Sequence, residues 1–293
     1  MELLKKIKEH FAAGINGMRT LDNTSTIYSI RDSGFYGVAM KFDNEMEVAE
    51  HSNNTKIFTR TLMLENNVAN KFLILACWNE SLRNQFANLC ADFVDLQKRE
   101  QLLRNPIDWW NHWVGLLGNK HLEKKSYSVI AEMLALDSIY QQDKTVEWTS
   151  EMAGTHDFET SSFSCEVKST VHKSDTKLTI SSQHQLKSEK TLYLNFCRME
   201  KSAHGVSIDD VKEMLILHGY DGDKLELQIE KAGFELGAVA RKEKYCVLEN
   251  RRYLVDNDFP KITNESFKGD MFPKAVVKIT YEIDLEGIKY EKW

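Results

Sequence analysis

The stretch at residues 156–170, HDFETSSFSCEVKST, decides how the rest of this sequence is interpreted. Two short segments within it, 157–160 and 162–170, contain aromatic and β-branched residues and predict two strands with a tight connection. If these strands form a hairpin, Asp157 at the start of the first lies beside Glu166 on the second. The sequence therefore predicts that two carboxylates from neighbouring strands meet.

The second strand also carries a lysine on the same face as its glutamate. Successive side chains of a strand point to opposite faces, so Glu166 and Lys168 share one face. Cys165 and Val167 point the other way, and Phe163 joins this apolar set. We expect the apolar side to face the core and the polar pair to emerge together, so that two carboxylates and an ammonium converge.

Such a cluster has a definite chemical use. Magnesium prefers oxygen ligands and keeps several waters, so one or two carboxylates, a backbone carbonyl and a substrate phosphate suffice to hold it. Asp157, Glu166 and the carbonyl of Val167 offer that set, for Mg²⁺ or alternatively Mn²⁺. A bound ion activates water and neutralises charge on a phosphodiester, while Lys168 orients the water or stabilises the transition state. The predicted reaction is phosphodiester hydrolysis.

The elements predicted around the hairpin follow a definite order. An apolar-rich helix is expected at 126–141 and a strand at 145–151. A serine pair caps a short helix expected at 181–189, and a strand follows at 191–198. The order is helix, three strands, helix, strand. Beyond it we expect two helices and two strands, at 208–218, 224–232, 244–254 and 275–284.

Both the order and the motif resemble the PD-(D/E)XK nuclease superfamily, whose core runs α-β-β-β-α-β, and the match covers residues 126–198. Asp157 matches the Asp of the motif, Glu166 its D/E position and Lys168 its Lys. His156 stands where the superfamily name has proline, a position that tolerates variation. The resemblance implies a restriction-endonuclease-like fold.

The superfamily often adds an acidic residue from the first core helix, and Glu132 matches that role. Independently, Glu132 lies beside Val129, Leu136 and Ile139 on an apolar helix face. A carboxylate there needs a partner or a metal, because burying it unpaired is costly. The alternative is an exposed glutamate at the edge of that face.

Many members also place a polar residue on the helix after the third strand. Gln183 and Gln185 are the candidates, and we favour Gln185 because its neighbour Leu186 is the expected buried anchor. Glu159, two residues after Asp157 on the same strand face, is a further carboxylate that replaces or assists it as a ligand.

At whole-chain level the sequence resembles a bacterial family described only as PD-(D/E)XK motif proteins. The supporting segments are IAEMLALDSIY, THDFE, EVKS, ISSQHQL, LYLNFCR and YLVDNDFPKI. Members are encoded in defence clusters with a MutL-like ATPase, a Z1-domain protein and an AIPR-type protein. The resemblance implies, by association, a role in antiphage defence and those proteins as partners.

The first part of the chain is a separate β-rich domain, expected at residues 1–118, with the nuclease-like domain at 119–293. Its strands are expected at 26–31, 35–42, 56–65 and 71–78. A long helix is expected from Asn79 to about Leu103. The tryptophans that follow, at 109, 110 and 113, suggest packing between the two domains, with a base-stacking platform as the alternative.

Charge and composition limit the partners. With 293 residues and a formal net charge of −6, the protein is not a generic polyanion binder, so DNA contact must be local. Residues 166–201 hold seven basic and four acidic residues. A second basic group is ordinary surface or grips a phosphate backbone, and it comprises Arg241, Lys242, Lys244, Arg251 and Arg252.

Five dispersed cysteines without a CxxC pair indicate buried thiols in a reducing compartment. No apolar run approaches the length of a membrane span, and no signal-peptide pattern occurs at the N-terminus. We therefore expect a cytoplasmic protein with no membrane partner.

Together these features predict an α/β protein with a β-rich N-terminal domain, a restriction-endonuclease-like αβββαβ core and a C-terminal α+β extension. The predicted function is Mg-dependent DNA cleavage within a defence system. One alternative is an inactive subunit that uses the same fold to bind nucleic acid or partner proteins. The other is a nuclease that acts on RNA.

Overall fold

The computed structural model describes residues 2–64, 68–117, 124–149, 156–174, 176–273 and 275–293. The chain forms two compact units. We call Met1–Leu122 with Glu235–Val239 the N-terminal unit, and Glu123–Phe234 with Ala240–Trp293 the C-terminal unit. The domain boundary predicted between residues 118 and 119 lies outside the described residues. Together the described residues form seven α-helices and three β-sheets.

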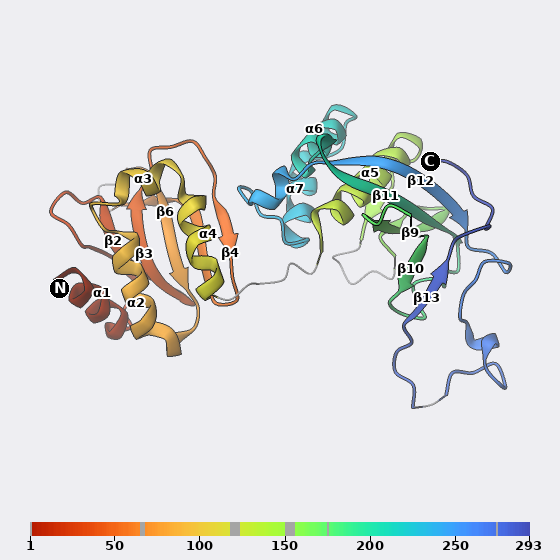
Figure 1. The fold of residues 1–293 in the computed structure, drawn as a ribbon, viewed down its shortest axis with the longest axis horizontal. Helices are drawn as coiled ribbons and strands as arrows, with labels where there is room; N and C mark the ends of the chain where they lie inside the picture. The colour runs from red at the N-terminus through yellow and green to blue at the C-terminus, as the bar shows by residue number, and fades with distance from the viewer. Residues whose placement is uncertain (1, 65–67, 118–123, 150–155, 175, 274) are drawn as a thin grey trace. The chain divides into compact units, whose positions relative to one another are not determined.

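The N-terminal unit is built on an antiparallel six-stranded sheet of order β1-β2-β3-β6-β5-β4 (Figure 1). This sheet confirms the predicted β-rich region, including all four predicted strands. Its strands are β1 (Gly17–Thr20), β2 (Ile27–Asp32), β3 (Phe35–Lys41), β4 (Ala49–His51), β5 (Thr55–Met63) and β6 (Ala69–Cys77). Four helices accompany it, namely α1 (Glu2–Ala13), α2 (Arg83–Phe93), α3 (Arg99–Arg104) and α4 (Pro106–Leu117).

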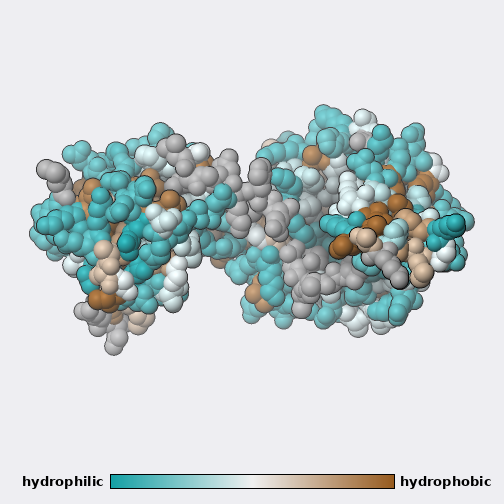
Figure 2. Space-filling view, turned by 90° about the horizontal axis from the view of Figure 1, so that it is seen from below, coloured by the Kyte–Doolittle hydropathy of each residue, from teal (hydrophilic) through white to brown (hydrophobic). Residues whose placement is uncertain are grey.

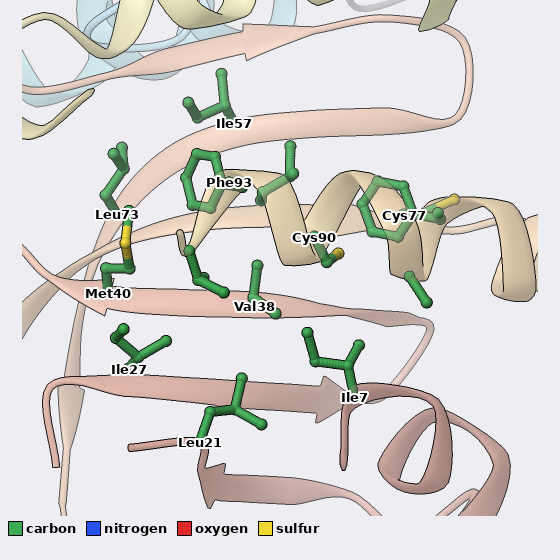
Figure 3. Packing of buried hydrophobic residues seen from close by; sticks show 14 of the residues in the cluster. Ile7, Leu21, Ile27, Val38, Met40, Ile57, Leu73, Cys77, Cys90 and Phe93 are labelled. Atoms are coloured by element: carbon green, nitrogen blue, oxygen red, sulfur yellow. The ribbon is translucent and has the colours of Figure 1, made fainter. Parts of the chain in front are cut away.

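The core of this unit lies between the helices and one face of the sheet. In Figure 3, Ile7 of α1 and Cys90 of α2 lie near Val38 of the sheet, and all three are fully buried. A second buried cluster, which includes Phe72 and Ile74, lies on the other face. Strand β6 is therefore apolar on both sides, which explains why its sequence is a continuous apolar run.

The single long helix predicted at 79–103 is wrong, because the chain turns after Phe93. A 3₁₀ turn at Glu80–Leu82 precedes α2, and residues 94–98 separate α2 from α3. The Asp95 side chain accepts a hydrogen bond from the backbone N–H of Gln97 within that turn. Leu96, which continues the apolar period in the sequence, is 67% exposed. The apolar repeat of a buried helix thus ends at Phe93.

The tryptophan run belongs to α4 and packs within the N-terminal unit, contrary to the expectation of packing between domains. Trp110 is buried in the core cluster of that unit. The Trp109 ring meets Phe93 edge-on at 4.8 Å between centroids, and its Nε1 donates to Asp92. These rings stabilise the unit in which they lie.

The C-terminal unit is built on a mixed five-stranded sheet of order β12-β11-β9-β8-β7. Its strands are β7 (Glu147–Trp148), β8 (Phe158–Glu159), β9 (Phe163–Thr170), β11 (Thr191–Val206) and β12 (Tyr245–Leu254). Strands β9 and β11 are parallel and the other pairs are antiparallel. Helix α5 (Ser126–Gln142) packs on β9 and β11 (Figure 1). The predicted helix and the strands around it are confirmed, but of the strand predicted at 145–151 only β7 forms, and residues 150–151 lie outside the described residues.

The short helix predicted at 181–189 is wrong. The chain leaves β10 (Lys177–Ile180), which pairs with β13 (Tyr281–Asp284), and makes only a turn at residues 183–186. Gln183 Oε1 accepts from the backbone N–H of Ile279, in the C-terminal segment. Polar groups here bond to a distant segment rather than to a helix. Of the strand predicted at 275–284, only β13 forms.

The remaining predicted helices are confirmed as α6 (Ile208–Leu217) and α7 (Gly222–Lys231). Ser207 caps α6 in a capping box with Asp210. With β12 and β13 they form the α+β region that follows β11. Arg241, expected at the surface, is buried and bonds to Asp209 and Glu226.

All five cysteines are free, and four of them are buried. No helix in the described ranges is long and apolar enough to span a bilayer. Figure 2 shows hydrophilic residues over most of the face drawn, with hydrophobic residues in smaller groups.

Two glycine substitutions test the packing of the N-terminal unit. A Cβ on Gly37 of β3 would lie 2.0 Å from the Leu75 carbonyl oxygen, whereas a Cβ on Gly115 of α4 would meet no atom within 4 Å. We expect Gly37→Ala to lower the free energy of unfolding by about 1–3 kcal/mol. Gly115→Ala should raise it by roughly 0.5–1 kcal/mol, because alanine favours a helix. Urea unfolding followed by tryptophan fluorescence measures both, and similar effects of the two changes would contradict this packing.

Candidate active site

The β8–β9 hairpin brings the first two predicted acids together. Its register pairs Phe158 with Cys165 in antiparallel strands. Asp157, directly before β8, therefore lies opposite Glu166 of β9. The Asp157 side chain accepts a hydrogen bond through Oδ2 from the backbone N–H of Val167, at 2.7 Å. The aspartate is therefore fixed to the neighbouring strand.

Glu166 is the centre of a small hydrogen-bond network. Its Oε1 accepts from Lys168 Nζ at 2.7 Å and from Gln185 Nε2 at 2.8 Å. Glu166 is only 3% exposed, so the expectation that the polar pair emerges from the sheet is wrong for this residue. Four consecutive residues of β9, from Ser164 to Val167, are buried, so both faces of the strand are covered there, and α5 is one of the elements that pack on it. Burial raises the pKa of Glu166, and the neighbouring Lys168 opposes that rise.

Glu132 reaches the same place from α5. It is 5% exposed, and its two carboxyl oxygens accept from Lys124 Nζ at 3.0 and 2.9 Å. Its Oε2 also accepts from Trp148 Nε1 at 2.9 Å. The edge-of-face alternative is thus wrong, and the buried carboxylate has found polar partners.

The three carboxyl groups act on one another electrostatically. Burial, followed by the charge of Glu166, raises the pKa of Asp157 to about 7, against the lowering effect of Lys124 and other groups. Burial and then the charge of Asp157 raise the pKa of Glu132 to about 7. Three carboxyls share the ammonium groups of Lys124 and Lys168, so the fully ionised cluster carries a net negative charge. A cation would relieve it.

The oxygen donors fit a hard cation through two of the three acids. Among the described residues, no set of three or more His, Cys, Asp or Glu side chains is arranged to hold a metal ion. Asp157 Oδ1 and Glu166 Oε2 accept no hydrogen bond from any residue described. Both oxygens of Glu132, in contrast, accept from Lys124. Two carboxylate oxygens with waters suffice for Mg²⁺.

Other predicted residues lie elsewhere. Glu159 Oε2 accepts from Ser164 Oγ at 2.9 Å, and its Oε1 lies 3.1 Å from His156 Nδ1, so its hydrogen bonds are not with the three acids. Gln183 pairs with the C-terminal segment, which leaves Gln185 as the glutamine at Glu166. Of the basic residues at 241–252 that are candidates for phosphate contact, three form ion pairs with acidic residues, namely Arg241, Lys244 and Arg251.

Sequence reasoning missed Lys124 and Trp148. Lys124 precedes α5 by two residues and Trp148 ends the two-residue strand β7. No motif or spacing marks either one, because both reach Glu132 through tertiary packing. A buried glutamate on an apolar helix face was the available signal that such partners exist.

The two acids and the lysine of this hairpin match the residue pattern expected of the PD-(D/E)XK motif. The family model described as "Putative PD-(D/E)XK family member, (DUF4420)" matches residues 12–286. The chain belongs to this family, which confirms the resemblance over most of its length. A search of curated proteins and a search of solved structures each returned no match.

The raised pKa values predict that the metal-free protein loses stability as the pH rises from about 5 to 8. The pKa of Asp157 in the folded chain is about 7, above its value of about 3.9 in an unfolded chain. Between these values the folded state holds more protons, so its stability falls with rising pH. In Asp157→Asn this fall should be smaller by on the order of 2 kcal/mol. Urea titrations with a chelator present measure it.

The exposed Asp258 supplies the matched control. Asp258→Asn should follow the pH dependence of the unchanged chain. A pH dependence in Asp157→Asn as steep as that of the unchanged chain would contradict the proposed crowding of the carboxyls.

Proposed function

We propose that this protein is a Mg-dependent phosphodiester hydrolase that cleaves DNA. The observation that carries the proposal is the pair of carboxylates, Asp157 and Glu166, that one hairpin holds beside Lys168 with one oxygen of each carboxylate left for a cation. In this proposal α5, β7, β8, β9 and β11 are elements of a restriction-endonuclease-like core. The turn at 183–186 takes the place of the helix between β9 and β11.

The proposed ligands of the ion are Asp157, Glu166 and the carbonyl of Val167. A bound divalent ion would supply an activated water and neutralise negative charge on the scissile phosphate. Lys168 Nζ, held 2.7 Å from Glu166, would stabilise the charge that develops on the phosphate. Gln185 fixes the Glu166 carboxylate through Oε1, so the second oxygen keeps its direction.

We assign Glu132 a supporting role, with direct ligation as the alternative. Its carboxylate lies within electrostatic reach of Asp157, and Lys124 holds both of its oxygens. Ligation by Glu132 would require Lys124 to move away. If Lys124 stays in place, Glu132 contributes a negative charge close to Asp157 and holds the Lys124 ammonium in position.

For the biological setting we propose antiphage defence in the bacterial cytoplasm. The basis is the resemblance to proteins encoded beside a MutL-like ATPase, a Z1-domain protein and an AIPR-type protein. These three are the proposed partners, and DNA is the proposed substrate.

The specific observation that favours an inactive, binding subunit is the internal pairing of the acids. Lys124 occupies both oxygens of Glu132, and Lys168 and Gln185 share one oxygen of Glu166. An ammonium that stays in place would substitute for a metal ion. Such a protein would bind nucleic acid or partner proteins without cleaving.

Cleavage of plasmid DNA by the purified chain with Mg²⁺ or Mn²⁺ separates the two functions. We expect Lys168→Ala to lower the rate by about 10²–10³-fold, as for other groups that stabilise transition-state charge. Lys173→Ala is the matched control, because this lysine is 80% exposed and pairs with Glu200. Calorimetric titration of Mg²⁺ should show lost affinity in Glu166→Gln.

Weak cleavage that rises when the proposed partners are added would support a regulated enzyme. Complete inactivity of the unchanged chain, together with DNA binding that Lys168→Ala leaves unaltered, would favour the binding subunit. Digestion of a matched RNA faster than DNA would favour the ribonuclease alternative.

A further inference from the structure

A polar groove of about 380 Å³ lies in the C-terminal unit, lined by charged and hydroxyl-bearing residues together with two histidines. The residues that matter for its chemistry are His156, Glu159, Ser164, Lys187, Glu189 and Lys190. Among the described residues, no apolar side chain lines it, so it does not suit a drug-like or apolar ligand.

The groove adjoins the proposed catalytic acids. Glu159 of β8 pairs with Ser164 of β9, and each lies two residues from Asp157 or Glu166 along its own strand. Side chains two apart share a face, at a distance of about 7 Å. The turn after β10 also contributes to both places, because Gln185 bonds to Glu166 while Lys187 lines the groove.

The groove contains two lysines and two glutamates, so its formal charge is zero, but of these four described residues only Glu159 and Lys190 form a pair. The Glu159 carboxylate accepts from Ser164 Oγ and lies 3.4 Å from Lys190 Nζ. Lys190 Nζ also donates to the carbonyl of Thr160 at 2.6 Å. Lys187, by contrast, is exposed, and its ammonium has no hydrogen bond or ion pair with any residue in the described ranges. It is available for an anionic ligand.

One of the residues that line the groove, His156, has a buried ring nitrogen without a hydrogen-bond partner among the described residues. His156 is 4% exposed, with Nδ1 held by Glu159 at 3.1 Å. Its Nε2 is buried and has no hydrogen-bond partner within the described part of the chain. An unsatisfied buried polar atom is unfavourable, so a ligand or an ordered water is expected beside it.

We propose that this groove binds the sugar-phosphate backbone of the DNA strand on one side of the scissile phosphate. The inference rests on the proposed function. Consecutive phosphates of one strand are about 3.4 Å apart along the helix axis, so about 7 Å places the groove within one or two nucleotides of the acids. Lys187 supplies the cation for a phosphate oxygen.

Two substitutions in the groove, one that removes a positive charge and one that removes a negative charge, test the proposal. In the full chain with a chelator present, binding of a fluorescein-labelled DNA duplex is followed by anisotropy over a series of salt concentrations. We expect Lys187→Ala to weaken binding about three- to tenfold and to reduce the salt slope by about one. Glu189→Gln removes a repelling charge from the same groove and should tighten binding.

Lys173→Ala, which removes an equal charge from outside the groove, should change the dissociation constant by less than Lys187→Ala does. Unchanged affinity in both groove variants, or an equal loss in Lys173→Ala, would overturn the inference. Tighter binding of a matched RNA would overturn the assignment to DNA.

The inference and the proposed function fail separately. If Lys168→Ala leaves cleavage unchanged while the groove variants shift binding as expected, the catalytic assignment fails and the groove stands. If Lys168→Ala abolishes cleavage and the groove variants bind normally, only the groove fails. Calorimetric Mg²⁺ affinity should be unchanged in Lys187→Ala, which shows that the metal site is intact.

Discussion

The C-terminal unit depends on one electrostatic constraint, the burial of three carboxyl groups close enough to raise one another's pKa. Like charges in a low-dielectric interior repel strongly, so the surrounding fold has to hold them together. Helix α5, the β8–β9 hairpin and the long strand β11 provide that rigidity through apolar packing. A site that binds a cation needs this arrangement, because relief of the repulsion favours binding.

The two lysines of the cluster reach it by different routes. Lys168 lies two residues from Glu166 on β9, so strand geometry alone brings the two side chains to one face. Lys124 comes from the segment before α5 and meets Glu132 across tertiary structure. One ammonium is thus built into the motif, and the other balances the acid that the helix contributes. As a result, Lys124 occupies both carboxyl oxygens of Glu132, whereas Asp157 and Glu166 each keep one oxygen for a cation.

The hairpin also links the cluster to the polar groove. The pair nearest the hairpin turn, Glu159 with Ser164, lines the groove. The pair farther from the turn, Asp157 with Glu166, belongs to the carboxyl cluster. The segment that follows β10 contributes Gln185 to the cluster and Lys187 to the groove. Gln185 and Lys187 lie two residues apart in the chain, so one short segment serves both places.

The sequence by itself determined the strands of the N-terminal sheet, the helix at α5 and the meeting of Asp157 with Glu166, because alternation and helical periodicity are local signals. Only the tertiary structure decided that Glu166 is buried, that Lys124 and Trp148 hold Glu132, and that a turn at residues 183–186 stands where the sequence predicts a helix. Each of these outcomes depends on groups distant in sequence, such as Ile279 for Gln183 and α5 for β9. Local propensity carries no information about such partners, and buried polar groups follow whichever partner the fold supplies.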